Sequence, residues 1–469
     1  MKKLVADSLF FKVVVIVLLA AAPCAAQDAL IAKVDALVKT EMQKNKVPGV
    51  SLAIVKDGRV VLAKGYGLAN VELQVPVKPE TVFQSGSMGK QFAATAVMML
   101  VEDGKINLDE KISKYLGAVP DAWKNITVRH VLTHTAGMAN DFPVEDYQKN
   151  FTEAEILKRA EALPLEFQPG ERWAYSNIGY KVLGILIGKV TGKFYGDFLQ
   201  ERIFKPLGMT TTRIINEADI IPNRAAGYTT DKGELKNQEW VSPTMNTTAD
   251  GSLYWTTLDL VKWDAALNTE KLLKKSSLEQ MWQPVKLNDG KTYPYGFGWA
   301  IDTIGKHRII EHSGAWQGFT TNISRYPNDK LTVIVLDNQS NFNPAKLSHQ
   351  IAGIFNAELA PQPVVAIEDK EPEITAQVRT FLAALAAGAA DPNLFTVEAR
   401  AKFFPAAAKE IGDGIKELGA LNRLELVRRR DQNEFRSYRY RLVYKETNLF
   451  LDYVLDKSGK IAGISLREE

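Results

Sequence analysis

Apolar positions early in the chain predict the first strands of a sheet. Residues 50–56 and 59–64 are rich in apolar and β-branched side chains, and the Asp57-Gly58 dipeptide between them suits a tight hairpin turn. Similar patterns return much later, at 308–312, 319–325 and 331–336. The long middle is expected to be mainly helical and rich in loops. We therefore expect one sheet built from both ends of a large first domain.

The end of this first domain is marked by a helix and a proline-containing segment. Asn343 is a good N-cap, Pro344 suits the first helical position, and the helix is expected to reach about Glu358. Residues 361–370 are expected to form a linker. The first domain is thus predicted to span residues 27–360.

The pattern beyond the linker predicts a second, smaller domain. Alanine-rich helical stretches occur at 374–387 and 406–418, and short strands are expected after them. Within 438–445 one set of positions is apolar or aromatic, as a strand with one buried face requires. These positions, Tyr438, Tyr440, Leu442 and Tyr444, alternate with Arg439, Arg441, Val443 and Lys445. Residues 371–469 are therefore predicted to be an α+β accessory domain, in which the basic run at 428–430 is a solvated strand end.

The first 26 residues resemble a signal peptide. Lys2 and Lys3 precede an apolar run at 13–22, and small residues follow at 24–26. The run is short for a membrane span, which disfavours an uncleaved anchor. A lipid anchor on Cys24 is disfavoured because Pro23 fits such a site poorly. Export to the periplasm or to the medium is the prediction.

Composition narrows the classes of partner. The 469-residue chain is 46% hydrophobic with a formal net charge of +3, and removal of residues 1–26, which carry a net +2, leaves +1. This balance does not favour a nucleic-acid partner. The one cysteine, Cys24, lies in the segment to be removed, and the five histidines lack zinc-ligand spacing. We therefore expect no metal site, and we leave the oligomeric state open.

Ser87 and Lys90 form the first candidate for catalysis. They lie at the start of an apolar stretch that is long enough for a buried helix and ends near Asp103-Gly104. Three residues make nearly one helical turn, so the Lys90 ammonium can reach the Ser87 hydroxyl and ease formation of an alkoxide. The spacing alone is weak evidence, because an N-cap serine followed by a surface lysine gives the same pattern.

Two further segments supply matching chemistry. Tyr175, beside a lysine ammonium that would favour its ionised form, can shuttle a proton, and Asn177 can hold a substrate amide. In the predicted strand that includes residues 309–315, His312 can be a positive or neutral donor. Gly314 lets a ligand lie close to the edge of this strand. The backbone N–H of Ala315, together with that of Ser87, can stabilise an oxyanion.

Taken together, these segments resemble the three motifs of the serine β-lactamase and penicillin-binding-protein superfamily. The motifs are Ser-x-x-Lys at 87–90, Tyr-x-Asn at 175–177, and His312-Ser313-Gly314 where the family has Lys or His, Thr or Ser, then Gly. Tyr-x-Asn is typical of the class C β-lactamase and D-Ala-D-Ala carboxypeptidase branch. Other stretches resemble the same branch, at 65–70, 132–138, 206–209 and 251–256. The resemblance covers roughly residues 30–358.

This resemblance implies an α/β fold with an antiparallel sheet flanked by helices and a helical subdomain that carries Tyr175. It implies a serine hydrolase that acts through an acyl-enzyme on D-amino-acid peptides, esters or β-lactam-like amides, with Ser87, Lys90, Tyr175 and His312 as catalytic residues. Asn177, Ser313, Gly314 and Ala315 would bind substrate. No cofactor would be required, the substrate would be a small molecule or a peptide, and a loose association with the cell envelope is expected. Class C β-lactamases have Lys at the position of His312, so antibiotic hydrolysis is placed behind the other activities. A true β-lactamase and a catalytically silent binding module remain the alternatives.

Several single residues also fit other interpretations. His134 resembles a structural element of the family more than a member of a Ser-His-Asp triad. Ser85 occupies a position where the nucleophile elbow of an α/β-hydrolase needs glycine. Tyr295 is expected to be a core residue that can also line the acyl pocket. For Trp316 and Phe319, substrate contact and core packing stay equally open.

Overall fold

The computed structural model describes residues 27–432, 435–445 and 447–468, so the predicted signal peptide lies outside the described residues. The chain divides into two compact units between Pro361 and Gln362, and each has its own hydrophobic core. Among the described residues, no helix has the length and apolar character that crossing a membrane requires.

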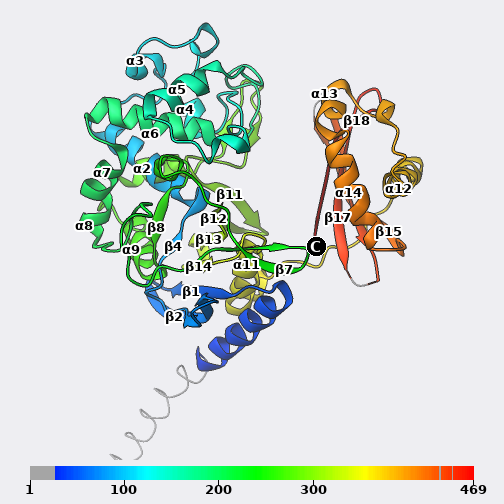
Figure 1. Cartoon of the computed structure of the whole chain (residues 1–469), viewed down its shortest axis with the longest axis horizontal. Helices are drawn as coiled ribbons and strands as arrows, with labels where there is room; N and C mark the ends of the chain where they lie inside the picture. Colours follow the sequence, from blue (N-terminus) through cyan, green and yellow to red (C-terminus); the bar gives the residue numbers. More distant parts are fainter. Residues whose placement is uncertain (1–26, 433–434, 446, 469) are drawn as a thin grey trace, which may run out of the picture. The chain divides into compact units, whose positions relative to one another are not determined.

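A seven-stranded antiparallel sheet is the centre of the first unit (Figure 1). Its strands, in spatial order, are β11 (Ala300–Ile304), β12 (His307–Trp316), β13 (Phe319–Tyr326), β14 (Leu331–Asp337), β1 (Gly49–Lys56), β2 (Arg59–Asn70) and β3 (Val75–Pro76). The pairing of β1 with β14 joins the two ends of this unit, from Val50 opposite Asp337 to Lys56 opposite Leu331. The predicted hairpin is confirmed, since Asp57 and Gly58 both have positive φ and link β1 to β2.

Helices cover both faces of this sheet, as the resemblance implied. Alternation along β14 sends Val333 and Val335 to one face, where they pack against α11 (Pro344–Phe355) and the helix at 27–45. Ile334 and Leu336 point to the other face, into the core shared with α2 (Lys90–Glu102) and α9 (Thr257–Leu267). As predicted, Asn343 caps α11 by accepting the backbone N–H of Lys346 at 3.0 Å.

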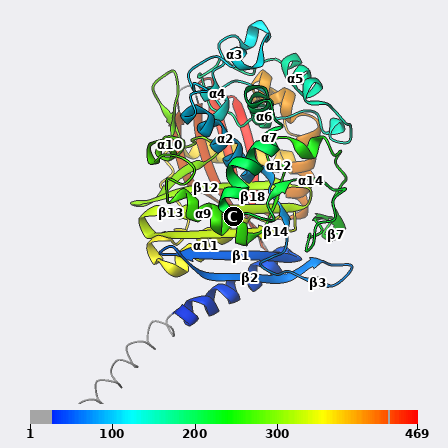
Figure 2. The ribbon, with the colours of Figure 1, turned by 90° about the vertical axis from the view of Figure 1, so that its left-hand side faces the viewer.

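The middle of the chain is mainly helical, as predicted, and its helical subdomain lies at the end of the unit away from β1 and β2 (Figures 1 and 2). Its helices are α3 (Ser113–Leu116), α4 (Val128–Leu132), α5 (Glu153–Ala162) and α6 (Asn177–Thr191). Further helices are α7 (Tyr195–Leu199), α8 (Lys205–Leu207) and α10 (Lys275–Met281). Short strands pair as β4 (Phe83–Gln84), β8 (Leu253–Trp255) and β5 (Arg213–Ile214), β6 (Tyr228–Asp231) with β7 (Glu234–Asn237), and β9 (Val285–Lys286) with β10 (Thr292–Tyr293).

The second unit is an α+β structure with a four-stranded antiparallel sheet. It consists of α12 (Pro372–Ala386), α13 (Val397–Phe403), α14 (Ala406–Glu417), β15 (Arg423–Gln432), β16 (Phe435–Val443), β17 (Asn448–Asp456) and β18 (Ile461–Glu468). The strands are 8 to 10 residues long, so the expectation of short strands was wrong. The basic run at 428–430 lies in the second half of β15, and Arg429 and Arg430 are exposed, as the prediction of a solvated run required. Arg428 and Arg429 also form ion pairs with Asp452 and Glu371.

Candidate active site

The turn that carries Ser87 is packed backbone to backbone against strand β12. Residues Gly86–Gly89 form a 3₁₀ turn that runs directly into α2. Gly86 has φ +51°, and a Cβ there would collide with the backbone nitrogen of Ala315. A Cβ on Gly314 would collide with the carbonyl oxygen of Ser85. Gly314 was expected to admit a ligand, but the close neighbour at this position is the chain's own serine turn.

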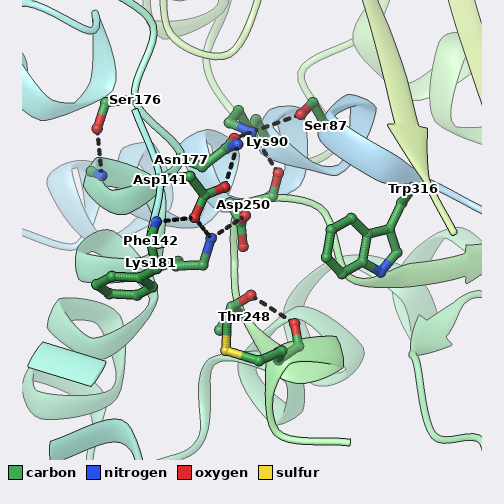
Figure 3. A network of polar contacts seen from close by, with 12 residues as sticks. Ser87, Lys90, Asp141, Phe142, Ser176, Asn177, Lys181, Thr248, Asp250 and Trp316 are labelled. Atoms are coloured by element: carbon green, nitrogen blue, oxygen red, sulfur yellow. Dashed lines mark hydrogen bonds and ion pairs between the residues drawn. The ribbon is translucent and has the colours of Figure 1, made fainter. Parts of the chain in front are cut away.

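Lys90 is fully buried and points at Ser87 (Figure 3). Its Nζ donates to Ser87 Oγ at 2.9 Å, to Asn177 Oδ1 at 2.7 Å and to the main-chain oxygen of Asp250 at 2.6 Å. The structure therefore brings the two ends of the Ser-x-x-Lys spacing together. Loss of hydration on burial lowers the pKa of Lys90 to about 7. Near neutral pH a large share of this amine is uncharged.

Tyr175 lies beside the same two residues, with Lys90 Nζ 4.8 Å from its ring centre and a side-chain hydrogen bond to Ser87. The sequence suggested that the lysine would favour the ionised phenol. That expectation was wrong, because burial raises the pKa of Tyr175 above its usual value, and the charges of Asp250 and Asp141 raise it further. Tyr175 is thus a phenol that keeps its proton.

Asn177 is the first residue of α6 and is held at both ends of its amide. Ser176 caps the helix by accepting the N–H of Gly179 at 3.0 Å, which fixes the first turn. The Asn177 oxygen accepts from Lys90, and its Nδ2 donates to Asp141 Oδ2 at 2.8 Å. The side chain that was expected to hold a substrate amide therefore also holds Lys90 in place.

His312 belongs to a chain of neutral hydrogen-bonding groups under the site. A carbonyl oxygen only accepts, so His312 Nδ1 donates to Ser313 O at 2.6 Å, and Nε2 accepts from the Tyr295 hydroxyl at 2.9 Å. His134 accepts the Ser176 N–H at Nδ1 and so donates from Nε2 to Tyr295 at 3.2 Å. Burial lowers the pKa of His312 to about 4. Of the two states expected for His312, burial favours the neutral one.

The rest of β12 follows the predicted alternation. His312 and Gly314 face inward, whereas Ser313 and Ala315 are exposed. The Ser313 hydroxyl donates to Asn322 Oδ1 on β13 at 2.8 Å. Ala315 and Trp316 line a small pocket that also contains Ser87. Trp316 is anchored there because its Nε1 donates to Asn246 Oδ1 at 2.6 Å.

Sequence reasoning missed a charged group beneath these residues. Lys181 lies one turn after Asn177 on α6, with a side chain only 3% exposed, and it forms ion pairs with Asp141 and Asp250. The sequence did contain an indication, because Lys181 is the one charged residue in the apolar stretch 178–187. A helix with such a stretch has no polar side on which a lysine could be solvated. Among the described residues, no group of three or more His, Cys, Asp or Glu is arranged to hold a metal ion.

Comparison with known proteins places this geometry in a family. The Beta-lactamase family model matches residues 34–353. The chain is 32% identical over 321 residues to Penicillin-binding protein 4* of Bacillus subtilis (strain 168), and the match covers 65% of this chain and 70% of that protein.

Solved structures agree with this match. An octameric penicillin-binding protein homologue from Pyrococcus abyssi has a TM-score of 0.64 and 26% identity, covering 94% of this chain and 98% of its own. D-amino acid amidase from Ochrobactrum anthropi SV3 has a TM-score of 0.60 and 25% identity, covering 71% and 97%. The chain belongs to the Beta-lactamase family, as a hydrolase with the fold shared by serine β-lactamases and penicillin-binding proteins.

Proposed function

We propose that this protein is an exported serine hydrolase that cleaves D-amino-acid peptides, esters or β-lactam-like amides through an acyl-enzyme on Ser87. The observation that carries the proposal is the contact of 2.9 Å between Ser87 Oγ and a buried lysine whose pKa is about 7. A neutral amine at this distance is a general base in hydrogen-bond reach of the nucleophile.

In the acylation step, neutral Lys90 accepts the Ser87 proton while Oγ forms a bond to the substrate carbonyl carbon. The negative charge that develops on the carbonyl oxygen is stabilised by the backbone N–H groups of Ser87 and Ala315, whose residues line the same pocket. The bond to the leaving group then breaks. Tyr175, which retains its proton, donates it to the leaving nitrogen or oxygen and recovers one from Lys90.

Water completes the cycle by attacking the acyl carbonyl. Lys90, neutral again, takes a proton from this water, and Ser87 leaves with a proton returned through the same pair of residues. The acid product and the free serine are released. Asn177 fixes the Lys90 amine through its oxygen during both halves of the reaction.

His312 bears on the choice of substrate. A neutral histidine at position 312 places no positive charge in this part of β12, so acyl donors without an adjacent carboxylate are favoured. We therefore place esters and amides of D-amino acids ahead of β-lactams. The similarity to a D-amino acid amidase at 25% identity supports this order. Penicillin-binding protein 4* is the relative that supports a test with penicillin.

The proposal includes the organisation of the chain. Residues 1–26 would be removed on export, 27–360 would form the hydrolase domain, and 371–469 would form an accessory domain after the linker at 361–370. The N-terminal pattern of two lysines, an apolar run at 13–22 and small residues at 24–26 supports the export step.

A panel of acyl donors tests the substrate order. D-alanine p-nitroanilide, its L-enantiomer, p-nitrophenyl acetate and nitrocefin would be compared by kcat/KM, each with Ser87→Ala as control. We expect the D-anilide and the ester to be cleaved faster than nitrocefin and the L-anilide. Fastest turnover of nitrocefin would identify a true β-lactamase, and no Ser87-dependent turnover of any donor would favour a silent binding module.

A further inference from the structure

Lys181 is the buried cation nearest to the proposed base outside the three motifs. Its Nζ lies 2.9 Å from Asp141 Oδ1 and 2.8 Å from Asp250 Oδ2 (Figure 3). A buried lysine is costly unless carboxylates pair with it, and here two of them do. Fold stability alone does not require this arrangement, since an apolar side chain at this helix position would fill the same space.

The two carboxylate residues continue from Lys181 to the proposed catalytic groups. Asp141 uses its second oxygen to accept from Asn177 Nδ2 at 2.8 Å, and the main-chain oxygen of Asp250 accepts from Lys90 Nζ at 2.6 Å. Lys90 also donates to Asn177 at 2.7 Å. The contacts therefore form a closed ring of five residues in which Lys181 lies opposite Lys90.

The net charge of this ring depends on Lys181. With Lys181 present, the two carboxylates leave a net charge of −1 beside Lys90; without it, the net charge would be −2. Asp250 and Asp141 raise the pKa of Lys90, whereas Lys181 lowers it. A positive charge in the ring thus opposes protonation of Lys90.

The other titratable groups around Lys90 are neutral near pH 7. They are His134 in the loop after α4, Tyr175 just before α6, Tyr180 in α6, Tyr295 before β11, and His312 in β12. Burial lowers the histidine pKa values and raises the tyrosine pKa values. Lys181, Asp141 and Asp250 therefore supply the nearby charges.

We propose that Lys181 is a positioning residue that neutralises the carboxylates beside Lys90 and so keeps Lys90 in its proton-accepting form. Through Asp141 it also fixes the amide of Asn177 that holds the Lys90 amine. The proposal deepens the acyl-enzyme function above and rests on Lys90 as its base. Lys181 acts through Lys90 and Asn177, not on the substrate itself.

Two substitutions that change the net charge of the ring in opposite directions test this role. Lys181→Met keeps the unbranched chain up to the ε position and removes the charged amine, and Asp250→Asn removes one negative charge while its main-chain oxygen still accepts from Lys90. The kcat/KM for p-nitrophenyl acetate would be measured from pH 5 to pH 9. We expect the acid limb of Lys181→Met to move up by about one pH unit, or about tenfold lower activity at pH 6, and that of Asp250→Asn to move down.

A matched control is available on the same helix. Lys189 is exposed on α6, and Lys189→Met makes the same change without touching the ring. Its acid limb is expected to coincide with that of the unsubstituted protein. If Lys181→Met fails to fold, the position of the acid limb in Asp250→Asn still tests the proposal. Acid limbs that stay in place in both variants, with only the plateau lowered, would overturn the positioning role.

A second readout separates this inference from the proposed function. The ¹³Cε resonance of Lys90 in lysine-labelled protein reports its protonation whether or not the enzyme turns over. It is expected to titrate about one unit higher in Lys181→Met. An unchanged Lys90 titration would refute the inference, whereas full activity in Ser87→Ala with a shifted titration would refute only the acyl-enzyme.

Discussion

Burial moves the pKa values of Lys90 and Tyr175 in opposite directions, and these shifts fit the different proton-transfer roles proposed for the two residues. Loss of hydration disfavours the charged form of each group, so the amine tends to be neutral and the phenol tends to keep its proton. In the proposed mechanism, the neutral amine accepts a proton from Ser87 and the protonated phenol donates one to the leaving group. We therefore expect activity to depend on pH. We also expect substitution of the neutral groups beneath Lys90 and Tyr175 to lower the free energy of unfolding.

The pH dependence follows from the sign of the Lys90 shift. In the proposed mechanism the active form of Lys90 is the neutral amine, so kcat/KM is expected to rise with pH through about 7 and to fall about tenfold per pH unit below it. A pH–rate profile with p-nitrophenyl acetate from pH 5 to pH 9 measures this limb. A flat profile between pH 5 and pH 8 would contradict Lys90 as the base.

The hydroxyl of Tyr295 links two buried histidines, and its loss is expected to be costly. Tyr295→Phe leaves Nε2 of His312 and Nε2 of His134 without a partner, which should lower the free energy of unfolding by about 2 kcal/mol. Urea unfolding measures this loss. Tyr293→Phe is the control, since that ring stacks on Trp173 at 4.1 Å and lies outside the chain of hydrogen bonds. Equal losses in the two variants would contradict the linking role.

At the scale of elements, the site depends on how the 3₁₀ turn before α2 meets β12. The turn presents Ser87, and the strand presents the backbone N–H of Ala315. Glycines at 86 and 314 let the two backbones touch, because either Cβ would collide with the opposite element. One contact between two elements thus sets the positions of the proposed nucleophile and of the proposed oxyanion site.

Gly86→Ala tests that contact, with Gly104→Ala at the other end of α2 as its match. Both glycines have positive φ, so both substitutions introduce backbone strain of about 1–2 kcal/mol. A Cβ on Gly104 meets nothing within 4 Å, whereas one on Gly86 meets Ala315. Acylation rates should fall by about 100-fold only in Gly86→Ala. Comparable activity in the two variants would show that the close packing is unimportant.

Elements with local signals were predicted well from the sequence. The hairpin at Asp57-Gly58 and the cap of α11 at Asn343 depend on neighbouring residues, and both are present. The pairing of Lys181 with Asp141 and Asp250 joins residues 40 and 69 positions apart, which no local pattern specifies. The ionisation of Tyr175 was mispredicted for a related reason, because its burial depends on the tertiary fold.

The whole molecule consists of two units with separate cores. The buried residues of the second unit, from Val378 to Ile461, form a cluster of their own. The proposed catalytic residues all belong to the first unit, which includes the region matched by the family model. Catalysis is therefore expected to need only the first unit.

Truncation tests this independence. A chain of residues 27–361 should fold cooperatively and hydrolyse p-nitrophenyl acetate with kcat/KM about equal to that of the longer protein. Thermal unfolding monitored by circular dichroism and steady-state kinetics provide the comparison. Loss of folding, or a changed preference between the D-anilide and the ester, would assign residues 362–469 a part in the active unit.

Acylation of Ser87 is the central claim, and rapid acid quenching with intact-mass and peptide-mapping spectrometry tests it most directly. The protein would be mixed with p-nitrophenyl acetate or benzylpenicillin, beside Ser87→Ala, while the free donor is followed. We expect a mass increase equal to the acyl group, on the peptide that contains Ser87, with at least one donor, and none in the variant. Hydrolysis that continues undiminished in Ser87→Ala, or an adduct on another residue, would contradict the account.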